Sequence, residues 1–334
     1  MLPAKYTTSP GKGRPGKSPT YEPPLGITGV VCSSHMLELP KRGKLHYTIY
    51  RPRMLRPSLS SKLPVAIRIL PPLVCVAGGP GLSSQYLSVL VHHITDRAVI
   101  LFDALGCGQS TRLPQAKLTL DEGVNDLVAL LHALFLNNDS QQKSRFHLLG
   151  HSSGGILAYE ALTRNDAVRK RCASLIQSNT PYSVSEALER RKKFCETWNG
   201  EDEDDDREED AETPAAVHFV RHECRRTPVP LLLHQSLSQV RTKTQSYDKD
   251  WETYKPQQEP QDQKAPSHPI PAALLISGQY DYVTDCDNWR SHLQCASEVQ
   301  CIRLAGTSHF SMVEDEGLYG TVVSTFLKES DNES

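Results

Sequence analysis

Short apolar segments recur along the chain, and the first three of them end in turns that contain glycine. They lie at residues 73–77, 98–102, 146–149, 173–176, 272–276 and 299–304. Continuous apolar runs of this length are typical of strands that are buried on both faces of a parallel sheet. Residues 36–39 and 45–50 flank Lys41-Arg42-Gly43 and predict a hairpin ahead of these strands.

Apolar residues at helical spacing fill several of the intervals between these segments. Residues 119–136 carry them at positions 120, 124, 127, 128, 131 and 134, and residues 153–163 and 316–327 predict two further helices. Thr119 is the expected N-cap of the first helix, and Glu122 completes a capping box. Strands that alternate with helices predict an α/β fold, with a mostly parallel sheet flanked by helices.

Two stretches interrupt this alternation. Residues 1–25 are rich in Pro, Gly, Ser and Lys, which predicts a disordered basic tail. Residues 181–269 are charged and rich in Gln and Pro, and we interpret them as a cap or lid inserted between two strands. Within this cap we expect a disordered acidic loop at about 199–213. This loop is either simply exposed to solvent or binds a basic partner. Residues 26–180 and 270–334 are expected to form the core.

Composition narrows the class of protein. The 37 basic and 39 acidic residues give a formal charge of -2, so there is no electrostatic case for binding nucleic acid. No apolar stretch approaches the roughly 18 residues that a membrane span needs. The first residues lack the apolar core of a secretory signal, and the nine cysteines contain no C-x-x-C pair. A cytoplasmic protein without a metal or organic cofactor is expected.

Gly150-His151-Ser152-Ser153-Gly154 matches the nucleophile elbow, G-x-S-x-G. In this motif a strand turns sharply into a helix, and the flanking glycines leave room for a strained central residue. The sequence context fits, because an apolar segment precedes the motif and a predicted helix follows it. Ser152 is therefore the candidate nucleophile.

A serine hydroxyl needs a base to activate it and an acid to orient that base. Asp281 follows the predicted strand 272–276, and His309 follows the strand 299–304, so both lie where ligands gather in open α/β sheets. We assign Asp281 as the orienting acid and His309 as the general base. Asp285 is the fallback acid. The other histidines considered as the general base, His92, His93 and His151, are weaker candidates.

Acyl transfer also needs hydrogen-bond donors for the oxyanion that develops in the transition state. One candidate is the backbone N–H of Ser153, at the start of the helix after the elbow. The other is the backbone N–H of Gly79, in the Ala77-Gly78-Gly79-Pro80-Gly81 loop after the strand at 73–77. A loop of glycines lets the backbone approach a substrate closely.

Together these blocks resemble the proline iminopeptidases of the α/β-hydrolase fold. The family shows H-G-G-P-G, D-x-R-G-x-G-x-S and G-G-S-W-G where this chain has the Gly78–Gly81 loop, residues 102–110 and the elbow. The blocks that contain Asp281 and His309 also resemble the family's acid and base segments. The similarity covers about residues 36–180 and 270–328. It implies a serine hydrolase that releases an N-terminal residue, typically proline, with a helical cap over the site.

The chain departs from the family pattern in ways that bear on substrate preference. Ala77 replaces the family's histidine, Leu105 replaces its arginine, and His151 and Ser153 stand where the family has Gly and Trp. In that family, carboxylates of the cap hold the free amine of the substrate. The candidates for that role here are Glu186, Glu189, Glu196 and Glu223.

Three functions remain open from the sequence. The first is an aminopeptidase of the proline iminopeptidase kind, acting on small peptides. The second is an esterase for small esters or lipids, since one triad serves many acyl substrates. The third is a catalytically silent fold that works as an interaction module. The substrate of either enzyme would be a small peptide or a small acyl compound.

Overall fold

The computed structural model describes residues 29–52, 70–79, 81–112, 119–136, 145–198, 213–240, 249–257, 270–293 and 296–332. The predicted tail at 1–25 lies outside these residues, and so do residues 199–212 of the predicted acidic loop.

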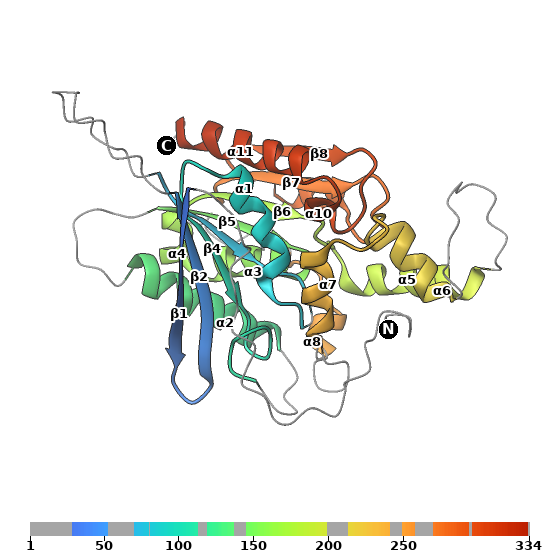
Figure 1. Cartoon of the computed structure of the whole chain (residues 1–334), viewed down its shortest axis with the longest axis horizontal. Helices are drawn as coiled ribbons and strands as arrows, with labels where there is room; N and C mark the ends of the chain where they lie inside the picture. Colours follow the sequence, from blue (N-terminus) through green and yellow to red (C-terminus); the bar gives the residue numbers. More distant parts are fainter. Residues whose placement is uncertain are drawn as a thin grey trace.

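One eight-stranded sheet forms the centre of the described chain, in the order β1-β2-β4-β3-β5-β6-β7-β8 (Figure 1). The strands are β1 (Val30–Leu39), β2 (Gly43–Pro52), β3 (Leu73–Val76), β4 (Val99–Asp103), β5 (Phe146–His151), β6 (Cys172–Ser178), β7 (Ala272–Gly278) and β8 (Val299–Leu304). β2 pairs antiparallel with β1 and β4, and all pairs from β4 to β8 are parallel. The predicted parallel sheet and N-terminal hairpin are confirmed, and β1 begins at Val30, earlier than expected.

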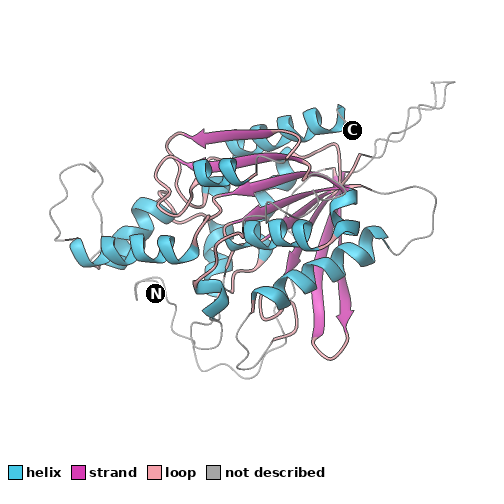
Figure 2. Cartoon of the chain, turned by 180° about the vertical axis from the view of Figure 1, so that it is seen from behind, coloured by secondary structure: helices cyan, strands magenta, loops and turns pink. Residues whose placement is uncertain are grey.

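Helices cover both faces of this sheet (Figure 2). One apolar layer packs α2 (Leu120–Leu131), α3 (Ser153–Arg164), α4 (Asp166–Arg171) and α9 (Cys286–His292) against the sheet. The opposite layer contains η2 (Ser84–Val89), α1 (Leu90–His93), α7 (Leu231–Ser238), α10 (Ser311–Glu314) and α11 (Glu316–Asn332). All residues of β3, β4 and β5 are buried, which explains why their sequences are mostly apolar.

The helix predicted at 119–136 changes geometry near its end. Its α-helical part is α2, and residues 132–136 continue as a π-helical turn, η3 (His132–Leu136). The Thr119 hydroxyl accepts a hydrogen bond from the Glu122 backbone N–H at 3.1 Å, so the predicted cap is present. Such a cap stabilises a helix by about 1 kcal/mol.

The chain between β6 and β7 forms a group of helices at the carboxyl ends of the parallel strands (Figure 1). We call this segment the β6–β7 insertion. Its described helices are α5 (Val184–Thr197), α6 (Pro214–His218), η4 (Phe219–Glu223), α7 and α8 (Lys249–Glu252). Helix α7 packs against η2, and α5 packs against α6. Across the described ranges, no helix has the length and apolar character that crossing a membrane would require.

Candidate active site

Ser152 lies at the sharp turn between β5 and α3, with φ 53° and ψ −126°. A positive φ is strained for a residue with a side chain, and such strain is found at functional sites. The turn is tight because a Cβ on Gly154 would lie 2.4 Å from the Val76 carbonyl oxygen. A Cβ on Gly150 would lie 2.3 Å from the Gly154 carbonyl oxygen. The structure therefore requires glycine at both positions of the motif.

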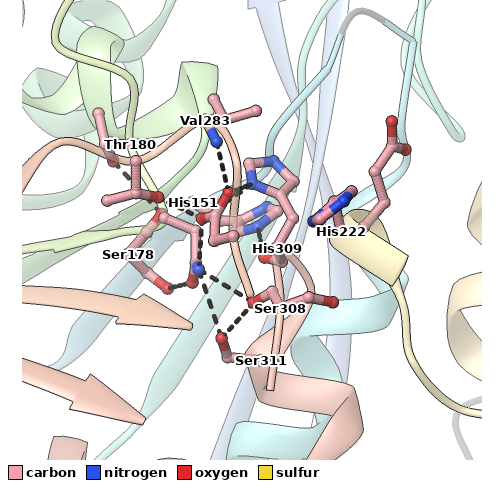
Figure 3. Close-up of polar contacts among 12 residues, drawn as sticks. His151, Ser178, Thr180, His222, Val283, Ser308, His309 and Ser311 are labelled. Carbon is pink, nitrogen blue, oxygen red and sulfur yellow. Dashed lines mark hydrogen bonds and ion pairs between the residues drawn. The ribbon is translucent and has the colours of Figure 1, made fainter. Parts of the chain in front are cut away.

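Asp281 and His309 meet at the same edge of the sheet, just beyond β7 and β8. Nδ1 of His309 lies 3.3 Å from both carboxylate oxygens of Asp281. The buried Asp281 carboxylate also accepts hydrogen bonds from the Asn179 side-chain amide at 2.8 Å, the Val283 backbone N–H at 2.8 Å and the Thr284 hydroxyl (Figure 3). These donors fix the carboxylate, which in turn orients the imidazole.

The two groups shift each other's pKa values. Burial alone would raise the pKa of Asp281, but the charge and hydrogen bond of His309 outweigh it and lower this pKa to about 2. Burial alone would lower the pKa of His309, but the Asp281 charge and hydrogen bond, with the charges of Glu223 and Glu314, raise it. Asp281 is therefore ionised at neutral pH, which keeps a proton on Nδ1 of His309 and leaves Nε2 to face other groups.

The elbow and the His309 loop are joined through His151. Its Nε2 lies 2.9 Å from the His309 carbonyl oxygen, and the two imidazole rings lie 4.9 Å apart between centroids. No hydrogen bond joins the Ser152 hydroxyl to His309 within the described part of the chain. Catalytic hydrogen bonds are often long or poorly aligned without substrate, so this geometry suits a resting enzyme.

The alternatives for acid and base lie elsewhere. Asp285 caps α9, where its carboxylate accepts the Asn288 backbone N–H at 3.0 Å, and among the described residues it makes no hydrogen bond or ion pair with His309. His92 and His93 belong to α1, which packs against α11. Of the acid candidates, Asp281 is the one that contacts His309.

Gly79 and Ser153 line the same pocket. Among the described residues, neither backbone N–H donates to another group, whereas the neighbouring Gly78 N–H donates to the Tyr86 hydroxyl at 2.8 Å. Ser153 is also the first residue of α3, where the helix dipole favours negative charge. Both amides can therefore serve a developing oxyanion.

This pocket has an apolar lining and holds about 500 Å³ of space, open solvent included. Trp251 of α8 contributes from the insertion, and no acidic or basic side chain is among the described residues of the lining. The lining residues are Val76, Ala77, Gly78, Gly79, Gly81, Leu82, Phe102, Ala104, Cys107, Thr119, Gly123, Ser153, Leu157 and Trp251. The pocket thus suits an uncharged group next to the elbow.

Glu223 is the insertion carboxylate that lies beside the His309 loop. Its carbonyl oxygen accepts the Phe310 backbone N–H at 2.9 Å, and the adjacent His222 carbonyl accepts the His309 N–H at 3.1 Å. Burial would raise the pKa of Glu223, but His218 and Arg191 outweigh it and lower this pKa to about 2. Its carboxylate lies 3.4 Å from His218 Nδ1 and 3.3 Å from Arg191. The other candidates, Glu186, Glu189 and Glu196, are exposed on α5.

A second serine–histidine–aspartate chain joins the N-terminal hairpin to the end of β4. The Ser34 hydroxyl lies 2.8 Å from His46 Nε2, and His46 Nδ1 lies 3.1 Å from the Asp103 carboxylate. Ser34 lies within the extended strand β1, and neither it nor its strand lines the pocket, whereas Ser153, which follows Ser152 directly, does. This chain therefore lacks the strained turn and the adjacent pocket that Ser152 has.

Several residues of the site were not predicted from the sequence. Asn179, which holds Asp281, follows β6 directly and has a positive φ of 51°. Its place after a strand at the carboxyl edge of the sheet could have drawn attention to it. Tyr86 contacts the elbow from 65 positions away in sequence, and no local pattern announces such a contact. Among the described residues, no group of three or more His, Cys, Asp or Glu is placed to hold a metal ion.

Comparisons with known proteins agree with this architecture. The model of the alpha/beta hydrolase fold family matches residues 71–316. The chain is similar to a proline iminopeptidase of Lactobacillus crispatus (strain ST1), with 40% identity over 119 residues, which is 34% of this chain and 37% of that protein. A proline iminopeptidase of Heyndrickxia coagulans is 41% identical over 88 residues, 26% of this chain and 28% of that protein. These matches therefore span well under two thirds of the relatives.

Solved structures share the fold over most of the chain. A proline iminopeptidase of Mycobacterium smegmatis superposes with a TM-score of 0.63 and 22% identity, covering 90% of this chain and 99% of that one. An esterase of Thermogutta terrifontis gives a TM-score of 0.59 and 18% identity, covering 90% and 99%. The predicted α/β-hydrolase fold and the resemblance to proline iminopeptidases are confirmed. A family match over well more than half of its length shows that the chain belongs to the alpha/beta hydrolase fold family.

Proposed function

We propose that this protein is a serine hydrolase that acts by acyl transfer, with Ser152 as nucleophile, His309 as general base and Asp281 as orienting acid. The observation that carries the proposal is the strained φ of 53° at Ser152, on a turn beside a buried Asp281–His309 pair. Strain of this kind is kept only where the surroundings enforce it.

The reaction follows from the roles of these groups. His309 Nε2 takes the proton of the Ser152 hydroxyl as its oxygen attacks the substrate carbonyl, and the N–H groups of Gly79 and Ser153 stabilise the oxyanion. His309 then protonates the leaving amine or alcohol, and the acyl group remains on Ser152. Water enters, loses a proton to His309 and releases the acyl group by the same steps.

For the substrate, we propose a small peptide or related amide with a free N-terminus, as in the proline iminopeptidases that the chain resembles. Glu223 supports this reading, because its carboxylate is ionised and its charge reaches His309. A carboxylate can hold an ammonium group by a charge-assisted hydrogen bond. Arg191 and His218 already contact Glu223, so an incoming amine would compete with them.

A small-ester hydrolase is the second candidate, and the pocket supports it. The described residues that line the space next to Gly79 and Ser153 carry no charge, and this environment favours a neutral acyl group. The two candidates share all the steps above and differ in whether the substrate needs a free amine.

Labelling with a fluorophosphonate tests the proposed nucleophile. We expect one covalent adduct in the wild type and none in the Ser152→Ala variant. Turnover by this variant should fall by at least about 1,000-fold. Ser34→Ala is the matched control, because Ser34 also belongs to a Ser-His-Asp chain, and this variant should be labelled and active like the wild type. Folded wild-type protein that resists labelling would instead favour the silent interaction module.

A panel of amino-acid anilides and short acyl esters tests the substrate class. The proposed aminopeptidase hydrolyses prolyl and related anilides, and N-acetylation of the same anilides abolishes their turnover. Hydrolysis of neutral esters without any turnover of free-amine substrates would replace it with the esterase.

A further inference from the structure

The oxyanion loop, the elbow and the His309 loop are connected by one chain of hydrogen bonds. The Gly78 backbone N–H donates to the Tyr86 hydroxyl at 2.8 Å, and this hydroxyl lies 2.7 Å from His151 Nδ1. His151 Nε2 lies 2.9 Å from the His309 carbonyl oxygen. The Tyr86 and His151 side chains are fully buried, so water does not satisfy these groups.

The direction of every bond in this chain follows from elementary chemistry. A carbonyl oxygen only accepts, so the proton of His151 lies on Nε2 and is donated to His309. The pKa of His151 is lowered to about 3, first by burial and then by the charge of His309, so the ring is neutral and Nδ1 accepts. The Tyr86 O–H therefore donates to Nδ1, and its oxygen accepts from Gly78.

Packing leaves this chain little freedom. A Cβ on Gly78 would lie 2.9 Å from His151 Nδ1 and 3.0 Å from the Ser152 Cβ, so the loop is pressed against the elbow. The Tyr86, His151 and Phe310 rings also pack on one another, with centroids 5.2 to 5.6 Å apart. Movement of His151 would therefore displace the loop that carries Gly79 and the backbone of His309.

We propose that His151 and Tyr86 are positioning residues, which hold the proposed oxyanion donor at Gly79 and the proposed base His309 in register with Ser152. This inference rests on the proposed function. His151 occupies a position where the resembled family has glycine, and the elbow motif accepts any residue there. The bonds that it makes are thus a feature of this chain's own structure.

Tyr86→Phe is the most direct test, because it removes one oxygen and leaves the ring in place. We expect kcat for a short ester and the rate constant of fluorophosphonate inactivation to fall by about 10- to 100-fold, with KM little changed. Tyr254→Phe is the matched control, since it removes a buried hydroxyl that donates to Glu160 at 2.7 Å, away from this chain. It should lower the thermal midpoint similarly and leave kcat unchanged.

Variants of His151 test separately its hydrogen bond to the His309 carbonyl and its hydrogen bond to the Tyr86 hydroxyl. His151→Gln offers an amide N–H toward the His309 carbonyl, and His151→Asn keeps an acceptor near the Tyr86 hydroxyl. We expect each variant to retain more activity than His151→Ala. Equal kcat values for these three variants at similar thermal midpoints would contradict a positioning role and leave only a structural one.

Hydrogen exchange of the Gly78 amide gives a readout that does not depend on activity. Exchange should accelerate in Tyr86→Phe and His151→Ala and remain unchanged in Tyr254→Phe. Unchanged exchange and unchanged kcat in Tyr86→Phe would overturn this inference alone. Loss of the proposed function would appear differently, as turnover that survives Ser152→Ala.

Discussion

At the scale of single residues, the backbone distinguishes the two serine–histidine–aspartate chains better than hydrogen bonding does. The Ser34 chain has the shorter serine–histidine contact, at 2.8 Å, but its serine lies in an extended strand. Ser152 has no such contact yet, but its φ of 53° and its neighbours place it beside the pocket. Preorganisation of the proposed nucleophile is therefore the more informative observation.

Asp281→Asn tests whether the acid controls the tautomer of His309. An asparagine amide pointing its N–H toward Nδ1 would favour the tautomer with the proton on Nε2, which cannot accept from Ser152. We expect turnover to fall by about 10,000-fold while the fold remains intact. The checks are steady-state kinetics and thermal unfolding. Activity within tenfold of the wild type would contradict the assignment of Asp281.

Glu223→Gln tests the charge that acts on His309. The Glu223 carboxylate helps to raise the pKa of His309, and a general base must be neutral to accept a proton. Removing this charge lowers that pKa, so the acid limb of kcat/KM against pH should move to lower pH. A neutral ester is the substrate, and Glu196→Gln, an exposed residue of α5, is the control. An unmoved limb would show that Glu223 does not act on His309.

The sequence predicted Ser152, Asp281 and His309 because each follows a recognisable strand, and the structure brings Asp281 and His309 into contact. It did not predict Asn179, Tyr86 or the bonds of His151. These contacts depend on three-dimensional proximity, and a single tyrosine or asparagine carries no pattern of its own. The register of the sheet and the packing of η2 bring these residues together.

At the scale of elements, long apolar strands and helices with clear periodicity were predicted well. The insertion was more difficult, because α6 and α8 are short and their sequences are mixed in polarity. Short helices are held by packing rather than by their own propensity, so the local sequence says little about them. The contribution of Trp251 to the pocket could not be foreseen for the same reason.

The pocket between α2, α3 and α8 should set how large a group the site accepts. Ala104→Leu adds three carbons to its lining and should raise KM for butyryl and longer esters by about 5- to 150-fold, since filling apolar space costs roughly 1–3 kcal/mol. Acetyl esters should be affected less. Ala129→Leu, half-buried on α2 outside this lining, is the control. Equal effects on all chain lengths would mean that the acyl group binds elsewhere.

At the scale of the whole molecule, a buried polar network ties the C-terminal helix to the start of the sheet strands. Arg97 donates to the Asp331 carboxylate at 2.7 Å and to His147 Nε2 at 3.0 Å. His147 Nδ1 lies 2.7 Å from the Ser174 hydroxyl. Burial, reinforced by the Arg97 charge, lowers the pKa of His147 to about 4 from its usual 6.5.

This network predicts a stability that depends on pH. Because the pKa of His147 is lower in the folded than in the unfolded chain, the unfolded chain takes up a proton first as the pH falls. The contribution of His147 is complete above about pH 6.5 and is lost as the pH falls toward 4. Between pH 7.5 and 5, the wild type should lose about 2 kcal/mol more unfolding free energy than His147→Gln. Urea unfolding of both proteins at the two pH values measures this difference. Equal losses of unfolding free energy in the wild type and in His147→Gln would contradict the prediction.

The backbone bonds between the insertion and the His309 loop have a consequence for how the molecule would admit its substrate. The backbone N–H groups of His309 and Phe310 donate to the carbonyl oxygens of His222 and Glu223, so the β6–β7 insertion helps to hold the loop that carries His309. If the insertion moved away to admit a substrate, both bonds would break, and the proposed base would be held less firmly just as bulk water entered. Under the proposed function, an open molecule would therefore cleave bonds less well than a closed one.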